Sequence, residues 1–405
     1  MWKVRLKDLN ENSEMKNNDG IIDVKKDVAY IFRNHFLKLR KKYAYPYHVL
    51  RVVESIIQCR TESLGRQIYS CDHCGHIEEI FLSCGNRHCP KCQYEKKQKW
   101  LKKQIDRILP IDYFHVVFTI PEELNNLVFY NQKTVYAILF KAIRETLSEL
   151  GKDRLGAELG AIAILHTWGQ NLSFHPHVHC IVTGGGLSIT SDRWVSCKKG
   201  YLLPVQVMSS LFRGKFLSYV KDVQGELKGK GQIKIDREQL SDILKPLYKK
   251  DWVVYSKPPF GSSEDVFKYI GNYTHRVAIS NSRIEQVSET DVTFKWRDYR
   301  DKNSIKLMTL SVEEFMRRFL LHVLPPKFVK IRYFGILANA AAGSREKCMK
   351  LFAGWTDKKQ TSEQIDNDAK KDEQKKQCTN CNSGQMHFCS VVYRSRDRPY
   401  SGIAK

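Results

Sequence analysis

Apolar residues recur at three- and four-residue spacing in several parts of the chain, which predicts amphipathic helices. The first helical region is expected over residues 25–60. A longer helix is expected over 130–150, because Gly151 directly after it is a common helix end. Three further helices are predicted by the same spacing, over 207–223, 239–248 and 311–321.

Strands are predicted between these helices, where apolar residues run continuously or alternate with polar ones. Buried strands are expected at 113–120, 161–168 and 252–255, and a basic strand at 324–335. Three alternating segments follow the middle of the chain, at 284–288, 292–297 and 304–310. The order strand, helix, strand, strand from residue 113 onward predicts an α+β sheet packed against helices.

Polar segments suggest where the folded parts end. Residues 1–24 are charged and have no apolar core, so we expect a poorly ordered leader. Residues 357–377 are almost wholly polar, which predicts a flexible linker because such a segment cannot bury a core. Residues 187–250 read as an insertion, and their basic side chains could line a DNA path.

The stretch FHPHVHCIVTGGG, residues 174–186, predicts a strand with chemistry on one face. His177 and His179 flank the apolar Val178, and side chains alternate along a strand. Both imidazoles therefore face one way while Val178 faces a core. Two imidazoles on one strand supply part of a metal site with open positions, although such a pair also arises by chance.

Twelve cysteines in a chain without a secretion signal point to metal binding rather than disulfides. Two pairs, Cys71 with Cys74 and Cys89 with Cys92, are separated by fourteen residues, close to zinc-ribbon spacing, and predict one structural Zn²⁺ site. Nearby residues could substitute as ligands or form a second site: Cys59, His73, His76, Cys84 and His88. Near the end of the chain, another pair predicts a small zinc knuckle, with His387 and Cys389 as further ligands: Cys378 and Cys381.

The charge balance favours a nucleic-acid partner. Lys and Arg number 67 against 44 Asp and Glu, which gives a net charge of +23. Lysines directly after the cysteine pairs, among them Lys96, Lys97 and Lys99, are expected to meet a DNA backbone. No apolar run approaches a membrane span, so we expect a cytoplasmic protein.

Residues 261–284 contain two tyrosines at helical spacing. Ser262 and Asp265 resemble a capping box, so a helix is expected to begin there. Tyr269 and Tyr273 then lie on one face of that helix. The same positions, together with Val266 and Val277, also fit an ordinary buried stripe.

Taken together, these stretches resemble a known family. A histidine–hydrophobic–histidine strand followed by a helix with tyrosines resembles the HUH endonucleases. Four segments between 59 and 339 resemble, in order, the rolling-circle transposases of the insertion-sequence ninety-one family: SCGNRHCPKCQ (83–93), HTWGQNLSFHPHVHCIVTGGG (166–186), YIGNYTHRVAISNSRI (269–284) and HVLPPKFVKIRYFGILAN (322–339).

The resemblance implies an HUH-like antiparallel sheet flanked by helices, after an N-terminal helical and zinc-ribbon domain. It implies a bacterial transposase that nicks one DNA strand through a 5′-phosphotyrosine, with Tyr269 and Tyr273 as nucleophiles. His177 and His179 would hold Mg²⁺ or Mn²⁺, with the third ligand open among Gln170, His166, Asn272 and His275. We also expect Arg276 and Arg283 to contact DNA, and the target to be a single-stranded or hairpin transposon end. The protein itself is expected to associate with the nucleoid.

The implied organisation has a zinc-binding domain at 25–110, a catalytic domain at 111–290, the rest of the core at 291–356 and a zinc knuckle at 378–405. Two other functions fit parts of the pattern. A plasmid or phage replication-initiation relaxase would use the same chemistry. A zinc-ribbon DNA-binding protein without catalysis would leave the histidine strand unexplained.

Overall fold

The computed structural model describes residues 26–105, 108–259, 276–298, 301–352 and 377–393. It also describes the short strands β1 (Lys16–Asn17) and β2 (Gly20–Ile21) and the single residues Asp265, Gly271 and Thr274. Most of the expected leader, both tyrosines and the expected linker up to residue 376 lie outside these residues.

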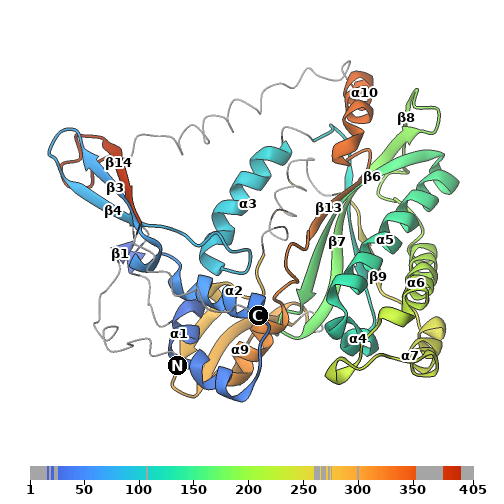
Figure 1. Ribbon diagram of the computed structural model, residues 1–405. Helices are drawn as coiled ribbons and strands as arrows, with labels where there is room; N and C mark the ends of the chain where they lie inside the picture. Colours follow the sequence, from blue (N-terminus) through green and yellow to red (C-terminus); the bar gives the residue numbers. More distant parts are fainter. Residues whose placement is uncertain are drawn as a thin grey trace, which may run out of the picture.

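A large antiparallel sheet forms the centre of the molecule (Figure 1). Its strand order is β13, β6, β7, β5, β9, and every pairing is antiparallel. The strands are β13 (Ile331–Gly335), β6 (Ala157–Trp168), β7 (Phe174–Ser188), β5 (Tyr113–Thr119) and β9 (Val254–Lys257), and β8 (Trp194–Ser196) pairs with the far end of β7. The α+β class with an antiparallel sheet is therefore confirmed. The basic segment expected as a strand over 324–335 is extended only in its last five residues.

Helices cover one face of this sheet, as Figure 1 shows. They are α4 (Asn125–Tyr130), α5 (Gln132–Leu150), α6 (Val205–Asp222) and α7 (Arg237–Lys249). Val178 and Cys180 of β7 point into this core and are fully buried. The segment expected as an insertion supplies α6 and α7, whose apolar residues belong to the same core, so it is integral to the sheet's packing.

The opposite face of the sheet is covered by less structure. The helices α3 (Pro90–Ile105) and α10 (Ala342–Phe352) pack there around a smaller cluster that contains Ile164 and Ile181. The indole Nε1 of Trp100 on α3 donates to the hydroxyl of Tyr333 on β13, at 3.1 Å. This face carries the candidate histidines, because they alternate with Val178.

A second core joins the N-terminal helices to residues 278–323. The helices α1 (Val28–Lys42) and α2 (Tyr47–Gln58) pack with α9 (Val312–Leu321) and with the sheet β10 (Ile284–Val287), β11 (Asp291–Asp298), β12 (Ser304–Ser311). Leu172, from the turn between β6 and β7, is fully buried in this core. The tip of the central hairpin is thus held by the second core. The proposed domain boundaries stay a prediction.

A separate three-stranded sheet has the order β14, β3, β4 and stands apart from the two cores (Figure 1). It consists of β3 (Arg66–Cys71), β4 (Ile77–Phe81) and β14 (Met386–Val392). Short helical turns complete the described part, at Glu62–Leu64, Glu122–Leu124, Gly151–Leu155, Gln224–Glu226, Lys230–Gln232, Asn281–Arg283 and Asn339–Ala341. Among these residues, no helix combines the length and the apolar character that crossing a membrane requires.

Candidate functional site

Three histidines meet on the less covered face of the central sheet. His177 and His179 come from β7, and His166 comes from the neighbouring strand β6. The strand register sets His166 opposite His177, so the three side chains share one face. One ring nitrogen from each lies within 4.8 Å of the others, a spacing that suits a single metal ion.

The hydrogen bonds of His177 direct its second nitrogen toward this point. Its Nδ1 lies 2.7 Å from the carbonyl oxygen of His175. A carbonyl can only accept, so Nδ1 carries the proton and the lone pair is on Nε2. The Nε2 atoms of His177 and His179 are 3.1 Å apart. Ligand atoms about 2.1 Å from an octahedral ion and at right angles to each other are about 3 Å apart, so this spacing fits a bound cation.

A fourth histidine, His115 on β5, bonds the ring nitrogen of His179 that does not face His177. Its Nε2 lies 2.8 Å from Nδ1 of His179, and the planes of the two rings are nearly parallel, at 12°. The register pairs His115 with Ile181, which makes it a diagonal neighbour of His179. With His179 Nδ1 engaged in this bond, its Nε2 faces His177. Metal-binding histidines often use their other nitrogen in this way. Sequence reasoning missed His115 because a lone histidine in an apolar strand gives no sign of its cross-strand neighbour.

Burial keeps the imidazoles of His177 and His179 neutral at physiological pH. It lowers the pKa of His177 to about 4 and that of His179 well below its usual value. Neighbouring positive charge, including Arg276, lowers the pKa of both further. A neutral imidazole is the form that binds metal. Arg276 therefore lies close enough to both histidines for its charge to act on them.

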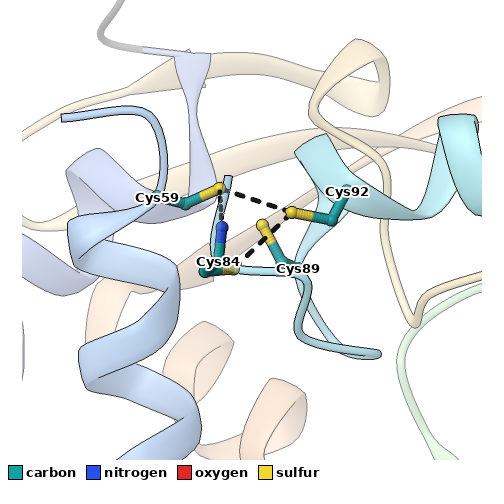
Figure 2. A group of neighbouring side chains, drawn as sticks. All are labelled: Cys59, Cys84, Cys89 and Cys92. Carbon is teal, nitrogen blue, oxygen red and sulfur yellow. Dashed lines mark hydrogen bonds between the residues drawn. The ribbon is translucent and has the colours of Figure 1, made fainter. Parts of the chain in front are cut away.

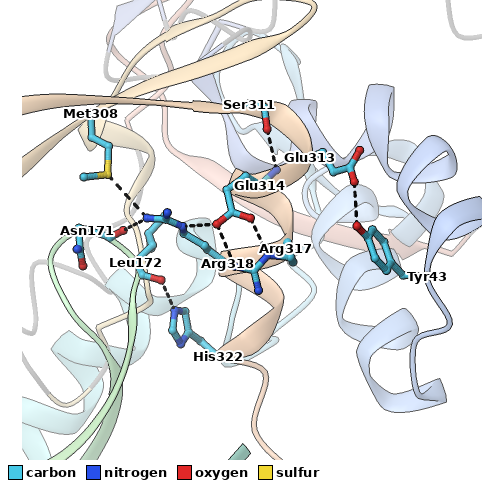
Figure 3. A network of polar contacts seen from close by, with 10 residues as sticks. All are labelled: Tyr43, Asn171, Leu172, Met308, Ser311, Glu313, Glu314, Arg317, Arg318 and His322. Atoms are coloured by element: carbon cyan, nitrogen blue, oxygen red, sulfur yellow. Dashed lines mark hydrogen bonds and ion pairs between the residues drawn. The ribbon is translucent and has the colours of Figure 1, made fainter. Parts of the chain in front are cut away.

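The turn that joins β6 and β7 is fixed by hydrogen bonds to three successive carbonyl groups. Arg283 donates to the carbonyl of Gln170, Arg318 to that of Asn171 at 3.1 Å, and His322 to that of Leu172 at 3.2 Å. Figure 3 shows the last two, together with Glu314, which holds Arg318 in place at 2.7 Å. The histidine hairpin is therefore anchored to α9 and the second core.

The other expected ligands of this site have different placements. The turn between β6 and β7 contains Gln170, whose carbonyl is engaged as described. Asn272 and His275 lie outside the described residues, as do Tyr269 and Tyr273. Within the same segment, Gly271 and Thr274 are helical and buried, and Gly271 packs against Leu101 of α3. Asp265 is likewise helical, and Ser262, the other residue of the expected capping box, lies outside the described residues.

The structure does not bring the cysteine pairs together as the spacing predicted. Cys89 and Cys92 group with Cys59 and Cys84, whereas Cys71 and Cys74 belong to a different group. The prediction of one site from Cys71, Cys74, Cys89 and Cys92 was therefore wrong. The first pair lies at the outer end of the β3–β4 hairpin, and that hairpin separates it from the second pair.

The first four-cysteine group lies between α2 and α3 (Figure 2). Cys92 has its sulfur 3.5 Å from that of Cys59 and 3.6 Å from that of Cys84. Tetrahedral Zn²⁺ with bonds of about 2.3 Å sets sulfurs about 3.8 Å apart, so the four side chains fit zinc. Cys59, Cys89 and Cys92 are buried and belong to the second core. From the sequence, Cys59 and Cys84 were considered only as substitute ligands, because the two closely spaced pairs already supplied four cysteines.

The second four-cysteine group joins Cys71 and Cys74 to Cys378 and Cys381. The C-terminal pair was expected to take His387 and Cys389 as further ligands. In the structure His387 bonds Asp72 at 3.0 Å, and Cys389 is exposed on β14. His88 also lies outside the metal-binding groups of the described residues; its ring accepts from the backbone N–H of Leu324 at 3.4 Å.

The residues expected to contact DNA differ in their exposure to solvent and in their hydrogen bonds within the protein. Lys99 on α3 is exposed, while Lys96 and Lys97 are half-buried, and Lys96 donates to the carbonyl of Gly85. Arg283 is occupied within the protein, since it also donates to the carbonyl of Lys295 at 2.7 Å. One cation that the sequence did not single out is Lys330, whose pKa is lowered to about 7 by burial and whose ammonium donates to the carbonyl of Arg276 at 3.4 Å.

Comparison with known proteins is consistent with this architecture. A family model described as "Putative transposase" matches residues 160–345, and one described as "Transposase zinc-binding domain" matches residues 31–120. The first range includes the three histidines and the second includes the Cys59 group. The C-terminal cysteines lie beyond both.

Two curated relatives match most of the chain. "Putative transposase y4qJ" of Sinorhizobium fredii is 45% identical over 320 residues, which cover 77% of this chain and 80% of the relative. The transposase for insertion sequence element IS801 of Pseudomonas savastanoi pv. phaseolicola is 27% identical over 310 residues, covering 73% and 71% respectively. With both family models matching in order, the chain belongs to the insertion-sequence ninety-one family of rolling-circle transposases.

Proposed function

We propose that this transposase nicks and rejoins single DNA strands through a covalent phosphotyrosine, with His166, His177 and His179 holding the catalytic metal. The observation that carries the proposal is the convergence of three imidazoles on one sheet face, within 4.8 Å of one another. A DNA-binding protein without catalysis would leave this group unexplained. The cleavage and transfer of DNA strands is what membership of a transposase family implies in general.

The nucleophile in this proposal is a tyrosine hydroxyl, from Tyr269 or Tyr273. The phenolic oxygen attacks the scissile phosphorus, a new O–P bond forms, and the bond from phosphorus to the 3′ oxygen breaks. The phenolic proton leaves the tyrosine, and the departing 3′ oxygen takes up a proton to become a free hydroxyl. Attack by that or another 3′ hydroxyl on the phosphotyrosine reverses the step and releases the enzyme.

A metal held by these histidines would polarise the phosphate and offset the charge that develops during attack. Three imidazoles favour Mn²⁺ over Mg²⁺, because Mg²⁺ prefers oxygen ligands. The protein contributes further through Arg276, whose positive charge acts on His177 and His179. A cation there suits the phosphate that is cleaved, so Arg276 is proposed as a phosphate contact.

The substrate is proposed to be a single-stranded or hairpin transposon end. A tyrosine side chain reaches a backbone phosphate most readily where the bases are unstacked. The protein's net charge of +23 supplies the general attraction to DNA.

The proposal is tested with a labelled single-stranded oligonucleotide that carries an element end, in the presence of Mn²⁺. We expect a protein–DNA adduct that survives denaturation, and its loss in His177→Ala and His166→Ala. Adduct formation at the wild-type rate in both variants would contradict the role of the histidines. Gel-shift binding of the same oligonucleotide serves as the control, since the variants should still bind DNA.

A further inference from the structure

We infer that Cys71, Cys74, Cys378 and Cys381 form a second zinc site, which fastens residues 377–393 onto the β3–β4 hairpin as a clasp between distant parts of the chain. This inference does not depend on the proposed DNA chemistry. It concerns a metal site whose two halves are about three hundred residues apart, and whose C-terminal half lies outside both family models.

The sulfur positions fit a tetrahedral zinc ion. Cys71 and Cys381 have their sulfurs 3.7 Å apart, and so do Cys74 and Cys378. All four sulfurs lie within 4.8 Å of one another. Zn–S bonds of about 2.3 Å in a tetrahedron give sulfur separations of about 3.8 Å, so no rearrangement is needed for binding. A disulfide would need about 2.05 Å between two of these sulfurs.

Both cysteine pairs sit on tight turns whose backbone N–H groups point at sulfur. The N–H groups of His73 and Cys74 donate to the sulfur of Cys71, at 3.4 and 3.5 Å. In the C-terminal turn, the N–H of Gly384 donates to the sulfur of Cys381, at 3.3 Å. Hydrogen bonds of this kind stabilise thiolates, the form that binds zinc.

The two turns also fit closely against each other. A Cβ on Gly384 would lie 2.4 Å from the sulfur of Cys71 and 2.6 Å from the Cβ of His73, so only glycine fits there. Asp72 and Gln385 exchange hydrogen bonds: the N–H of Gln385 donates to the carboxylate at 2.7 Å, and the N–H of Asp72 donates to the carbonyl of Gln385 at 3.1 Å. The contact between the two turns therefore depends on Gly384 and on the hydrogen bonds between Asp72 and Gln385.

The clasp completes a sheet that has very little core of its own. β14 pairs antiparallel with β3, from Met386 opposite Cys71 to Val392 opposite Arg66. Among the residues that the structure describes, the buried cluster beside it consists of Cys71, Cys378 and Met386, with Tyr69 and Cys381 partly buried against them. A two-stranded hairpin with so small a core is marginally stable, and small modules of this kind depend on a metal. Zinc is therefore what keeps β14 docked.

Native mass spectrometry of the full-length protein tests the inference directly. We expect two zinc ions per chain, one in the double variant Cys378→Ser/Cys381→Ser, and faster amide hydrogen exchange, by tenfold or more, in residues 66–71 of that variant. Exchange in α5 should be unchanged, which shows that the rest of the protein is folded. Two zinc ions in the double variant, one in the wild-type protein, or unchanged exchange in 66–71 would each overturn the inference.

A variant that keeps all four cysteines tests the docking of the two turns without removing a zinc ligand. Gly384→Ala keeps all four cysteines but places a methyl group against Cys71, so one zinc should transfer to a competing chelator at least tenfold faster than in the wild-type protein. Gly214→Ala on α6 is the matched control, because its Cβ meets no atom within 4 Å. Equal rates of zinc transfer in the two variants would contradict the docking described here.

Discussion

Nε2 of His115 lies 2.8 Å from Nδ1 of His179, so a side chain that touches no proposed substrate fixes the orientation of a proposed metal ligand. The planes of the two rings are nearly parallel, at 12°. His115 is a positioning residue, and its effect is expected to pass through the metal.

Replacement of His115 should therefore weaken metal binding more than it slows the chemical step. We expect His115→Phe to raise the Mn²⁺ concentration for half-maximal nicking about 10- to 100-fold, the usual range for such supporting residues. Activity should largely return at saturating Mn²⁺, and His115→Gln, which keeps a polar partner, should show a smaller shift. A variant whose maximal rate falls without any change in Mn²⁺ dependence would rule out this role.

Arg318 and Arg317 offer a matched pair for testing the anchored turn. Both bond Glu314, at 2.7 and 2.6 Å, but only Arg318 also reaches the carbonyl of Asn171. Arg318→Ala should lower the free energy of unfolding by about 1–2 kcal/mol, since it removes charged hydrogen bonds from a part-buried site. Arg317→Ala, more exposed, should cost well under 1 kcal/mol. Urea unfolding followed by tryptophan fluorescence measures both, and equal losses would contradict the anchoring role.

Acid should destabilise the protein through its buried histidines. Burial lowers the pKa of His322 to about 4, whereas a histidine in an unfolded chain titrates near 6.5. Between these values the unfolded state binds a proton that the folded state does not, so stability falls as the pH drops from about 6.5 toward 4. Above pH 6.5 this group has no effect on stability.

The urea midpoint at pH 7.5, 6 and 5, without added divalent metal, measures this dependence. We expect the midpoint to fall as the pH is lowered, and to fall less steeply in His322→Gln. At pH 5 the free energies of unfolding of the two proteins, each relative to its own value at pH 7.5, should differ by on the order of 1–2 kcal/mol. Glutamine retains an N–H that can donate to the carbonyl of Leu172. An identical pH dependence in the variant would contradict the assignment.

Zinc at the Cys59 group should be needed for the second core. Cys89 is buried between α2 and α3, so Cys89→Ala should release one zinc ion and lower the melting temperature through loss of the metal's contribution to folding. Cys180→Ala is the matched control, because Cys180 is equally buried but lies in the central sheet, outside the metal-binding groups of the described residues. Atomic absorption gives the zinc content. Retention of both zinc ions by Cys89→Ala would contradict the ligand role.

The sequence predicted well those features that depend on neighbouring residues. The strand that carries His177 and His179, the helix up to Leu150 and the alternating strands between 284 and 310 all follow from local periodicity. Gly151 was expected to end that helix, but it is itself helical, and the winding continues through Leu155 to Gly156, which has the left-handed conformation. Features that depend on distant pairing were harder. His166 joins His177 only through the register of β6 against β7, which the turn and the bulges fix.

The cysteines show the same limit more clearly. Cys71 and Cys74 have the spacing of half a zinc site, and so do Cys89 and Cys92, and spacing alone does not say which halves combine. The answer depends on the β3–β4 hairpin, which carries the first pair away, and on β14, which brings Cys378 to it. A pattern confined to the 22 residues from Cys71 to Cys92 could not reveal a partner about three hundred residues away.

The most direct test of the central claim is a mass-spectrometric map of the peptide that becomes covalently linked to DNA. After reaction of the wild-type protein with a single-stranded element end and Mn²⁺, the nucleotide is predicted on Tyr269 or Tyr273, with no adduct in His177→Ala. Nucleotide on any other residue, or the same adduct at the same yield in His177→Ala, would contradict the account.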